Sequence, residues 1–472
     1  MKFLQHSAYA LLLMTVAVSC NKENDVTIDD KTLKVNTFIT ETMKEVYLWT
    51  DKMPTNINYR QESDPKAYFD KLLYKAEDKW SFITDDYEGL IGSLSGQETT
   101  YGYSVAFGRF INSSNIFAVV QYVYPNSPAE LAGLKRGDIF IKINGSAITD
   151  NNYLQFIYSN NITITLGEYD SGGISMDGIG TVTLTARPMQ LNAVLIDTVI
   201  NYQGRKIGYL FYTQYYESTT SLDNALLSFK ADGITDLVLD LRYNPGGYVS
   251  TARHLCSALA PRTVVAQKEI LITKHWNNLY QNHWTTNNEQ GQLEERFDAS
   301  LVTNNVNMDL QQLYVLTGRG TASASELTIT GLQPYMNNIT LIGGTTVGKY
   351  VASATLRSQK NGQVDSELSN WAIQPIIFAY ANARGDSFKN GFVPDYDVED
   401  DYIRNPMPLG DMQEALLAKA LELITGVAPT SAKAAQHEPL PYRIVGTGFS
   451  RFDNFRGNAI EQLTTVGIEH GK

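Results

Sequence analysis

Three short segments in the second half of the chain have residue types and spacing that could support nucleophilic catalysis. Residues 318–326 set serines among small residues at an expected helix start, where a nucleophile has to stay accessible. Residues 240–247 end in Asn-Pro-Gly-Gly, and paired glycines let the backbone approach a ligand and face negative charge with free N–H groups. Residues 343–349 present Lys349 after glycines. Each segment follows an expected strand, and ligands of open α/β sheets bind at the carboxyl ends of strands.

Each of these segments, taken singly, also fits ordinary structure. Asn-Pro-Gly-Gly could be a plain turn, and the serines at 323 and 325 could cap a helix. Residues 344–349 resemble a weak phosphate loop, but they lack the Walker A spacing and have Tyr350 where Ser or Thr is needed.

The elements that would position the three segments alternate between strands and helices from residue 206 onward. Apolar runs predict strands at 207–211, 236–240, 313–316 and 339–342, and helices at 222–229, from 249, at 325–332 and at 412–424. Strands with little polar alternation, each followed by a helix, predict an α/β core with a largely buried sheet. Before this core, residues 31–86 have helical spacing and residues 95–190 alternate as short strands.

Length and composition limit the function classes. A chain of 472 residues predicts two to four domains, and 43% apolar with 19% charged residues excludes wholesale disorder. The net charge of −12 makes nucleic acid a poor partner. Two cysteines exclude a disulfide framework and CxxC zinc sites. The acidic run at 395–401 lacks calcium-loop spacing and predicts a solvated face.

The first twenty residues have the pattern of an export signal. Residues 8–18 are apolar apart from Thr15 but too few to span a bilayer, and Ala17-Val18-Ser19-Cys20 resembles a bacterial lipobox. We therefore expect a lipoprotein signal peptide at 1–20, lipid attached to Cys20, and a polar tether at 21–30. Ordinary cleavage with an incidental cysteine is the alternative. Cys256 is then unpaired and predicted to be a small buried hydrophobe.

The β-rich region contains a stretch that resembles a PDZ domain of the kind that bacterial proteases carry. Residues 127–145 match over a short helix, a Gly-Asp turn, a strand and an Asn-Gly hairpin. PDZ domains add an extended peptide as an extra strand and hold its terminal carboxylate on backbone amides. The matching loop departs from the family pattern, and its peptide-binding residues are expected to be Gly102, Tyr103, Ser104 and Val105. A structural domain with a blocked groove is the alternative.

In combination, the parts resemble the carboxy-terminal processing, or tail-specific, peptidases, which are Ser-Lys serine proteases. The order matches from the helical segment through PDZ, Asn-Pro-Gly-Gly, Ser-Ala-Ser-Glu and Gly-Lys to Gly-Phe-Val-Pro-Asp at 391–395. The resemblance implies a multidomain α/β fold with an N-terminal helical domain (31–86), a PDZ domain (87–190), a crotonase/ClpP-like peptidase core (191–426) and a poorly ordered C-terminal tail (427–472).

The resemblance also assigns roles to individual residues. Ser323 matches the nucleophile and Lys349 the general base, while the N–H groups of Gly246 and Ala324 would form the oxyanion hole. Ser353 stands where much of the family has a glutamine that completes a triad, and its hydroxyl could orient the lysine amine. Ser325 and Glu326 are interpreted as helix-start structure, and Glu326 could also orient the site.

The lysine base imposes a condition on the fold. Lysine with an ordinary pKa of about 10.4 is protonated at neutral pH, so Lys349 has to be buried and its pKa lowered by about three units. His254, in the helix expected after residue 249, is the rival base, although it has no distinctive neighbours.

The resemblance implies an exported, lipid-anchored serine endopeptidase of the bacterial cell envelope, periplasmic or at the cell surface. It would capture proteins with free, apolar C-termini and hydrolyse their peptide bonds through an acyl-enzyme, without metal or cofactor. It would touch the membrane only through its lipid. One alternative is a peptide-binding lipoprotein that keeps the architecture without turnover. A literal crotonase-like core would instead predict an acyl-CoA enzyme, but CoA thioesters are cytoplasmic and the export signal argues against it.

Overall fold

The computed structural model describes residues 28–461 except 112, 171–172, 430–441 and 449–457. The predicted signal peptide, the lipidation site Cys20 and most of the predicted tether lie outside the described residues. In the part that is described, no helix is both long and apolar enough to cross a membrane.

The N-terminal segment is helical and packs on the strands that follow the lysine. Its elements are α1 (Asp30–Val46), η1 (Thr50–Lys52), η2 (Tyr59–Gln61), α2 (Pro65–Leu72) and β1 (Phe82–Thr84). Asp64 caps α2 by accepting the N–H groups of Lys66 and Ala67, with Pro65 in the first turn, as helix starts favour. The apolar faces of α1 and α2 share one buried cluster with Val351 and Ile376.

The β-rich domain is an antiparallel sheet in the order β10-β7-β5-β4-β3-β26. Its strands are β3 (Tyr103–Phe110), β4 (Ile116–Val123), β5 (Ile139–Ile143), β6 (Ser146–Ala147), β7 (Asn161–Gly167), β10 (Gly180–Thr185) and β26 (Tyr442–Gly448). Short helices α4 (Pro128–Leu131) and α5 (Gln155–Tyr158) accompany them, and β8 (Tyr169–Asp170) pairs with β9 (Gly173–Ile174). A ladder of β2 (Gln97–Thr100) with β11 (Arg187–Gln190) joins the domain to the rest of the chain.

The core contains a six-stranded sheet in the order β12-β13-β14-β18-β19-β25, which is parallel from β13 to β25. Its strands are β12 (Val194–Tyr202), β13 (Arg205–Tyr212), β14 (Asp236–Asp240), β18 (Gln312–Thr317), β19 (Asn338–Gly343) and β25 (Tyr396–Asp397). The main helices around it are α6 (Thr220–Asp232), α7 (Val249–Leu259), α12 (Ala324–Leu332) and α13 (Ala415–Thr425). The mixed α/β fold that the sequence predicts is confirmed.

A second sheet runs beside the first in the order β15-β27-β20-β24-β16-β17. Its strands are β15 (Gly246–Tyr248), β27 (Asn458–Ile460), β20 (Val351–Ser353), β24 (Ile376–Asn382), β16 (Ile270–Trp276) and β17 (Glu294–Arg296). The remaining elements are α8 (Arg262–Ala266), α9 (Asn278–Thr286), α10 (Gln290–Leu293), α11 (Ser300–Thr303), β21 (Gln359–Lys360), β22 (Gln363–Val364), η3 (Ser366–Leu368) and β23 (Ala372–Gln374).

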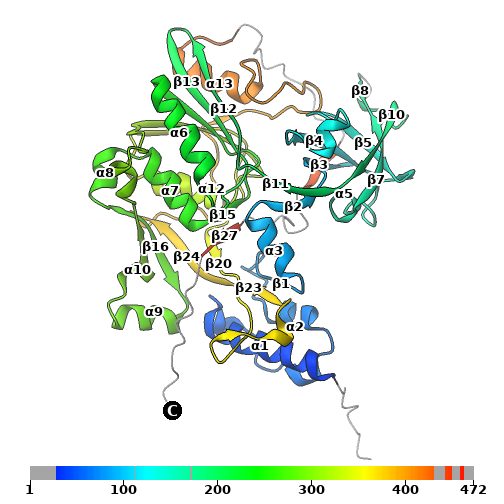
Figure 1. The fold of residues 1–472 in the computed structure, drawn as a ribbon, viewed down its shortest axis with the longest axis vertical. Helices are drawn as coiled ribbons and strands as arrows, with labels where there is room; N and C mark the ends of the chain where they lie inside the picture. The colour runs from blue at the N-terminus through cyan, green and yellow to red at the C-terminus, as the bar shows by residue number, and fades with distance from the viewer. Residues whose placement is uncertain (1–27, 112, 171–172, 430–441, 449–457, 462–472) are drawn as a thin grey trace, which may run out of the picture.

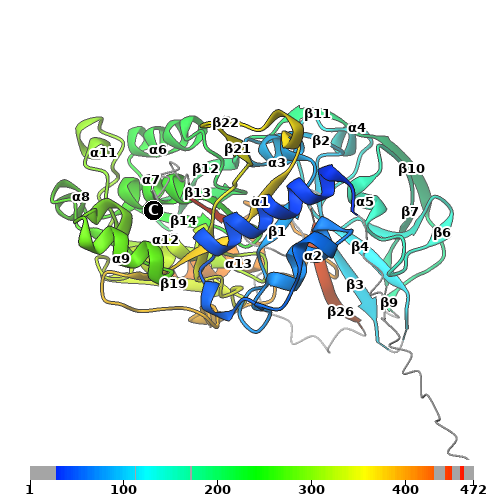
Figure 2. The ribbon, with the colours of Figure 1, turned by 90° about the horizontal axis from the view of Figure 1, so that it is seen from below.

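The expectation of a poorly ordered tail after residue 427 is wrong for two segments. β26 pairs with β3 of the β-rich domain, and β27 pairs with β15 and β20 of the core (Figures 1 and 2). Each segment gains order from a distant strand, and pairing of that kind leaves no local pattern in a sequence.

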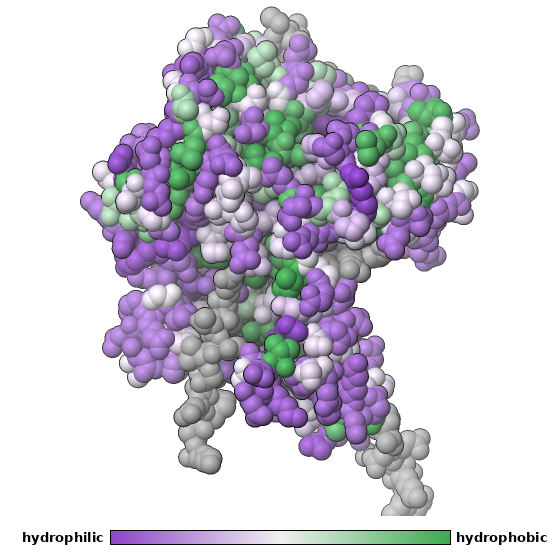
Figure 3. Space-filling model, in the orientation of Figure 1, coloured by the Kyte–Doolittle hydropathy of each residue, from purple (hydrophilic) through white to green (hydrophobic). Residues whose placement is uncertain are grey.

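Helix α3 (Tyr87–Leu94) also differs from the prediction. The sequence assigns residues 87–190 to the β-rich domain, but Leu90 and Leu94 pack with Tyr248 and Ala372 of the core. In the space-filling view the outer parts of the molecule are mostly hydrophilic, and apolar residues gather along the middle of the face (Figure 3).

Candidate active site

Ser323 lies in a sharp turn between β18 and α12. Its backbone has φ 61° and ψ −110°, a conformation that non-glycine residues seldom adopt and that often marks functional turns between a strand and a helix. The side chain is 0% exposed, and its Oγ makes no hydrogen bond among the described residues. Since the hydroxyl has neither solvent nor a hydrogen-bond partner, it is a buried polar group that the fold itself leaves unsatisfied.

Lys349 lies two residues before β20, in the segment that follows β19. It is 1% exposed, so the burial that the sequence analysis requires of a lysine base is present. Its Nζ is 5.9 Å from the ring centroid of Trp80, which comes from the N-terminal segment. The N-terminal helices therefore contribute directly to the surroundings of the amine.

The carboxylate of Glu326 connects the serine segment with the lysine segment. Oε2 accepts the backbone N–H groups of Ser323 at 2.8 Å and Lys349 at 2.9 Å. Oε1 accepts the N–H of Gly348 at 2.6 Å and the hydroxyl of Thr346 at 2.5 Å. Burial raises the pKa of Glu326 above its ordinary value, while these hydrogen bonds act in the opposite direction. Glu326 is thus more than the helix-start residue that its position in the sequence suggests.

Tyr380, on β24, makes a second connection that the sequence analysis does not identify. Its hydroxyl donates toward the carbonyl oxygens of Ser323 at 3.1 Å and Lys349 at 3.0 Å. Burial holds the pKa of Tyr380 well above its ordinary value, so the hydroxyl remains a donor. Two buried side chains therefore hold the two segments at a fixed separation.

The Asn-Pro-Gly-Gly turn contacts the serine turn, because the carbonyl oxygen of Asn244 accepts the N–H of Ala322 at 3.1 Å. The expected oxyanion donor of this turn is occupied. The N–H of Gly246 donates to Oδ1 of Asn244 at 2.9 Å. Gly247 has φ 145°, and a Cβ atom there would lie 2.1 Å from the carbonyl oxygen of Tyr215, so only glycine fits. Ala324 is the first residue of α12, beside Ser323. The Gly246 donor becomes available to an oxyanion only when its bond to Asn244 opens.

Ser353 ends β20 and is buried. Its Oγ accepts a hydrogen bond of 3.1 Å from the side-chain amide of Gln374, on β23. The other amide atom, Oε1 of Gln374, is buried and has no hydrogen-bond partner in the described part of the chain. A glutamine amide is therefore present next to the position where the family's glutamine is replaced, but it comes from a different strand.

His254 does not join the site. Its Nε2 lies 2.6 Å from Asp223 of α6, which orients the imidazole away from the role of rival base. Among the described residues no hydrogen bond connects it with Ser323. Cys256, in the same helix, is fully buried as expected.

The prediction that the acidic run at 395–401 forms a solvated face is wrong for Asp400. Asp400 is not part of a solvated face: it pairs with Arg136 of the β-rich domain at 2.5 Å and with Arg242 at 3.2 Å. Burial acts to raise the pKa of Asp400, but the two guanidinium groups lower it overall. Arg136 also donates to the hydroxyl of Tyr243 at 2.6 Å, directly before the Asn-Pro-Gly-Gly turn. This buried charge network ties the β-rich domain to the core.

Of the four residues expected to bind peptide, Gly102 directly precedes β3 and the other three are the first residues of that strand. Gly102 has φ 79°, and a Cβ atom there would lie 2.2 Å from Cβ of Ser127, so the close packing of the short helix requires glycine. The Tyr103 side chain points into the domain core, where its ring is 5.6 Å from that of Tyr101. Ser104 donates to Gln121, and Val105 is buried.

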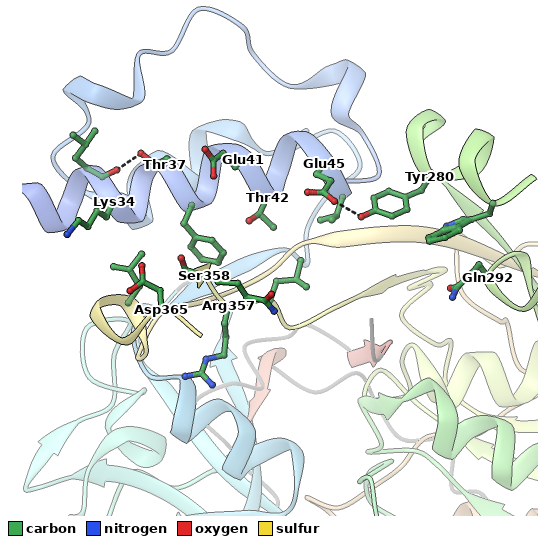
Figure 4. Close-up of a pocket in the computed structure, with 17 residues that line it drawn as sticks. Lys34, Thr37, Glu41, Thr42, Glu45, Tyr280, Gln292, Arg357, Ser358 and Asp365 are labelled. Carbon is green, nitrogen blue, oxygen red and sulfur yellow. Dashed lines mark hydrogen bonds between the residues drawn. The ribbon is translucent and has the colours of Figure 1, made fainter. Parts of the chain in front are cut away.

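One sizeable cavity lies away from these residues. It has a volume of about 560 Å³ and lies between α1 and the segment after β20 (Figure 4). Glu45 and Tyr280 are hydrogen-bonded at 2.8 Å on one side, and Arg357 lies on the other. Neither Ser323 nor Lys349 lines this cavity, so it is separate from the candidate active site.

Comparison with known families agrees with this arrangement. The model of peptidase family S41 matches residues 206–398, the S41 N-terminal domain matches 34–82, and a PDZ domain matches 119–162. The chain belongs to peptidase family S41. The β-rich domain is its PDZ domain, and the segments bearing Ser323 and Lys349 lie within the matched peptidase region.

Individual relatives of this S41 chain are distant. It is 24% identical over 342 residues to a "Probable CtpA-like serine protease" of Staphylococcus saprophyticus, covering 71% of this chain and 60% of that protein. It is 25% identical over 341 residues to the "Carboxy-terminal processing protease CtpA" of Bacillus subtilis, covering 67% of each. The chain thus spans about 60% of the length of the first of these relatives.

A solved structure of a Bacteroides fragilis protein, described as a "Putative S41 protease", has a similar fold. The two chains are 26% identical, with a TM-score of 0.66, over 83% of this chain and 98% of that one. The S41 assignment therefore rests on the sequence and on the arrangement of the whole fold.

Proposed function

We propose that this S41 chain is an exported serine endopeptidase that binds protein C-terminal tails with its PDZ domain and cleaves them with Ser323 and Lys349. The double connection of these residues through Glu326 and Tyr380 carries the proposal, because it holds a buried serine and a buried lysine on adjacent segments. The name of the Bacillus subtilis relative supports carboxy-terminal processing as the class of reaction.

The proposed reaction is hydrolysis of a peptide bond through an acyl-enzyme on Ser323. Oγ of Ser323 attacks the carbonyl carbon of the scissile peptide bond while its proton passes to the neutral amine of Lys349. The tetrahedral oxyanion is held by the N–H groups of Gly246 and Ala324, once Gly246 has left Asn244. When the C–N bond breaks, Lys349 returns the proton to the leaving amine and an acyl-enzyme remains. Water, deprotonated by Lys349, then releases the acid and restores Ser323.

In this proposal the active site is not accessible to a substrate in the resting arrangement of the chain. Ser323 is fully buried and its Oγ has no hydrogen-bond partner, so the pair has to realign when a substrate binds. The amide of Gln374 and the hydroxyl of Ser353 would position the lysine segment during that step.

We also propose an apolar free C-terminus as the preferred tail and a lipid anchor at Cys20 in the cell envelope, both on the sequence pattern alone.

The test uses soluble protein beginning at Asn21, incubated with an unfolded protein that has an apolar C-terminus. Ser323→Ala and Lys349→Ala are compared with two exposed controls, Ser228→Ala in α6 and Lys360→Ala in β21. We expect mass spectrometry to find fragments with the parent and both controls and none with the two site variants. The rate of the parent and of both controls should rise with pH through one ionisation, that of the lysine base.

Two results would contradict the proposal. Fragments that persist in Ser323→Ala would exclude this nucleophile. Binding of the unfolded protein without cleavage, equal in the parent and the site variants, would make the chain a peptide-binding protein that keeps the S41 architecture.

A further inference from the structure

We infer that two C-terminal segments, residues 442–448 and 458–461, are built-in peptide ligands of this chain. The first occupies the strand position of a peptide at the PDZ edge, and the second occupies a strand position beside the catalytic turn. The inference rests on the proposed function for the meaning of the second position. In both positions the bound strand is part of the chain's own C-terminal region.

The first position is the outer edge of β3. A PDZ domain binds peptides by adding them as a strand to an exposed sheet edge, next to the loop that holds the carboxylate. One edge of β3 is paired with β4, and the other is paired with β26, antiparallel from Tyr442 opposite Phe110 to Gly448 opposite Val105. β26 thus runs toward the loop at Gly102, in the direction of a bound tail, and it lies along the β-rich domain beside β3 (Figure 2). Another peptide cannot pair with this edge until β26 leaves.

Side chains of β26 reinforce the pairing. Tyr442 is buried against Phe117, with ring centroids 4.8 Å apart at 82°. Ile444 packs on the same cluster, while Val445 packs on the opposite face of the sheet, in the domain core. Contacts on both faces show a seated strand rather than a segment that touches the edge in passing.

The second position lies between the two strands that flank the catalytic segments. β27 pairs in parallel with β15, which starts at Gly246 of the proposed oxyanion hole, and with the end of β20, four residues after Lys349. The N–H of Glu461 donates to the carbonyl oxygen of Ser353 at 2.8 Å. β15 and β20 are neighbours only through β27, so this strand fills a slot between them (Figure 1). Pairing of main-chain groups with flanking strands is the way in which an extended peptide is recognised by strand addition.

The side chains around Ile460 and Glu461 indicate which residues fit the slot between β15 and β20. Ile460 is 3% exposed and shares a buried cluster with Leu90, Leu94, Tyr248 and Ala372, so an aliphatic side chain fits there. The next residue, Glu461, lies 3.3 Å from Nζ of Lys274, a buried amine that also pairs with Glu295 at 2.5 Å. The slot therefore takes an extended segment with an aliphatic residue at the position of Ile460, and competing substrates should share this residue.

The test is a binding measurement that does not need cleavage. A fluorescein-labelled peptide with the sequence of residues 442–461 is titrated, by anisotropy, with three proteins that start at Asn21 and carry Ser323→Ala. They are the full chain, the chain ending at Pro429, and the full chain with Ile460→Asp. We expect the shortened chain to bind the peptide at least tenfold more tightly than the full chain, because a tethered ligand competes at roughly millimolar effective concentration. Ile460→Asp should bind it with intermediate affinity.

Controls separate this inference from the proposed function. A labelled peptide carrying Ile460→Asp should bind the shortened chain more weakly than the parent peptide. Ile460→Asp keeps the full chain, so it remains informative if the shortened protein does not fold. Equal affinity of the full chain, the variant and the shortened chain would overturn the inference, whatever cleavage assays show. The three proteins can also be made with Ser323 restored. If none of them then cleaves an unfolded protein, that result counts against the proposed function and not against this inference.

Discussion

The backbone N–H of Lys349 donates a hydrogen bond of 2.9 Å to the carboxylate of Glu326. The same carboxylate oxygen accepts the N–H of Ser323, three residues before Glu326 in the chain. The carboxylate accepts four hydrogen bonds. If glutamine replaced it, the NH₂ group of the amide would face N–H or hydroxyl groups that now donate to a carboxylate oxygen. The relative placement of the Ser323 and Lys349 segments thus depends on one buried carboxyl group.

Replacing that carboxylate tests its role as a positioning residue. In Glu326→Gln, an NH₂ group faces two of the four donors, so we expect a loss of about 3 kcal/mol in the free energy of unfolding. Activity should fall at least tenfold in kcat at temperatures where the variant is folded. Urea unfolding and peptidase assays measure both, with the exposed Glu88→Gln as the matched control. An unchanged kcat in a folded Glu326→Gln protein would contradict the role.

Gln374 and Ser353 offer a second test. Because the amide of Gln374 donates to Ser353 Oγ, we expect the two residues to act on the lysine segment as one unit. Gln374→Leu and Ser353→Ala should each lower kcat about tenfold with little change in KM, and the double variant should be no worse than either. Steady-state kinetics of the cycle decides this, with the exposed Gln363→Leu as control. Effects that multiply in the double variant would mean that the residues act independently.

Much of the fold can be predicted from the sequence because buried strands carry uninterrupted apolar runs. The runs at 139–143 and 236–240 coincide with β5 and β14. β26 and β27 escape prediction for the opposite reason. Asn458-Ala459-Ile460 has no strand pattern of its own, and its order comes from pairing with strands more than a hundred residues earlier.

The site divides in the same way. Ser323 and Lys349 stand in motifs with local signatures, so their types and spacing suffice to find them. Tyr380 and Gln374 arrive from other strands, and only the topology brings them near the serine and lysine segments. One signal could have pointed to Gln374: it is the single polar residue within the apolar run Trp371–Ile376.

The buried thiol of Cys256 gives a prediction about the rigidity of the core. Burial raises the pKa of Cys256 to about 12, so at pH 8 only about one thiol in ten thousand is ionised in the native state. In protein beginning at Asn21, where it is the one remaining cysteine, we expect no modification by iodoacetamide over an hour, but full modification in denaturant. Mass spectrometry measures the adduct. Rapid modification of the native protein would show that α7 opens readily.

The docked C-terminal segment should respond to pH through Glu461. Burial raises the pKa of Glu461 above its ordinary value, with Lys274 and Arg253 opposing this shift and Glu295 reinforcing it. A carboxyl whose pKa is higher when docked than when free stabilises docking fully below pH 4.5, and this contribution is lost as the pH rises through the docked pKa. A labelled peptide carrying Glu461→Gln, whose own docking does not titrate at this position, should therefore bind the Ser323→Ala full chain more tightly at pH 8 than at pH 5. The full chain with Glu461→Gln, measured with the same peptide, isolates the effect: if its pH dependence matches that of the parent, the carboxyl of the docked segment is not the group responsible.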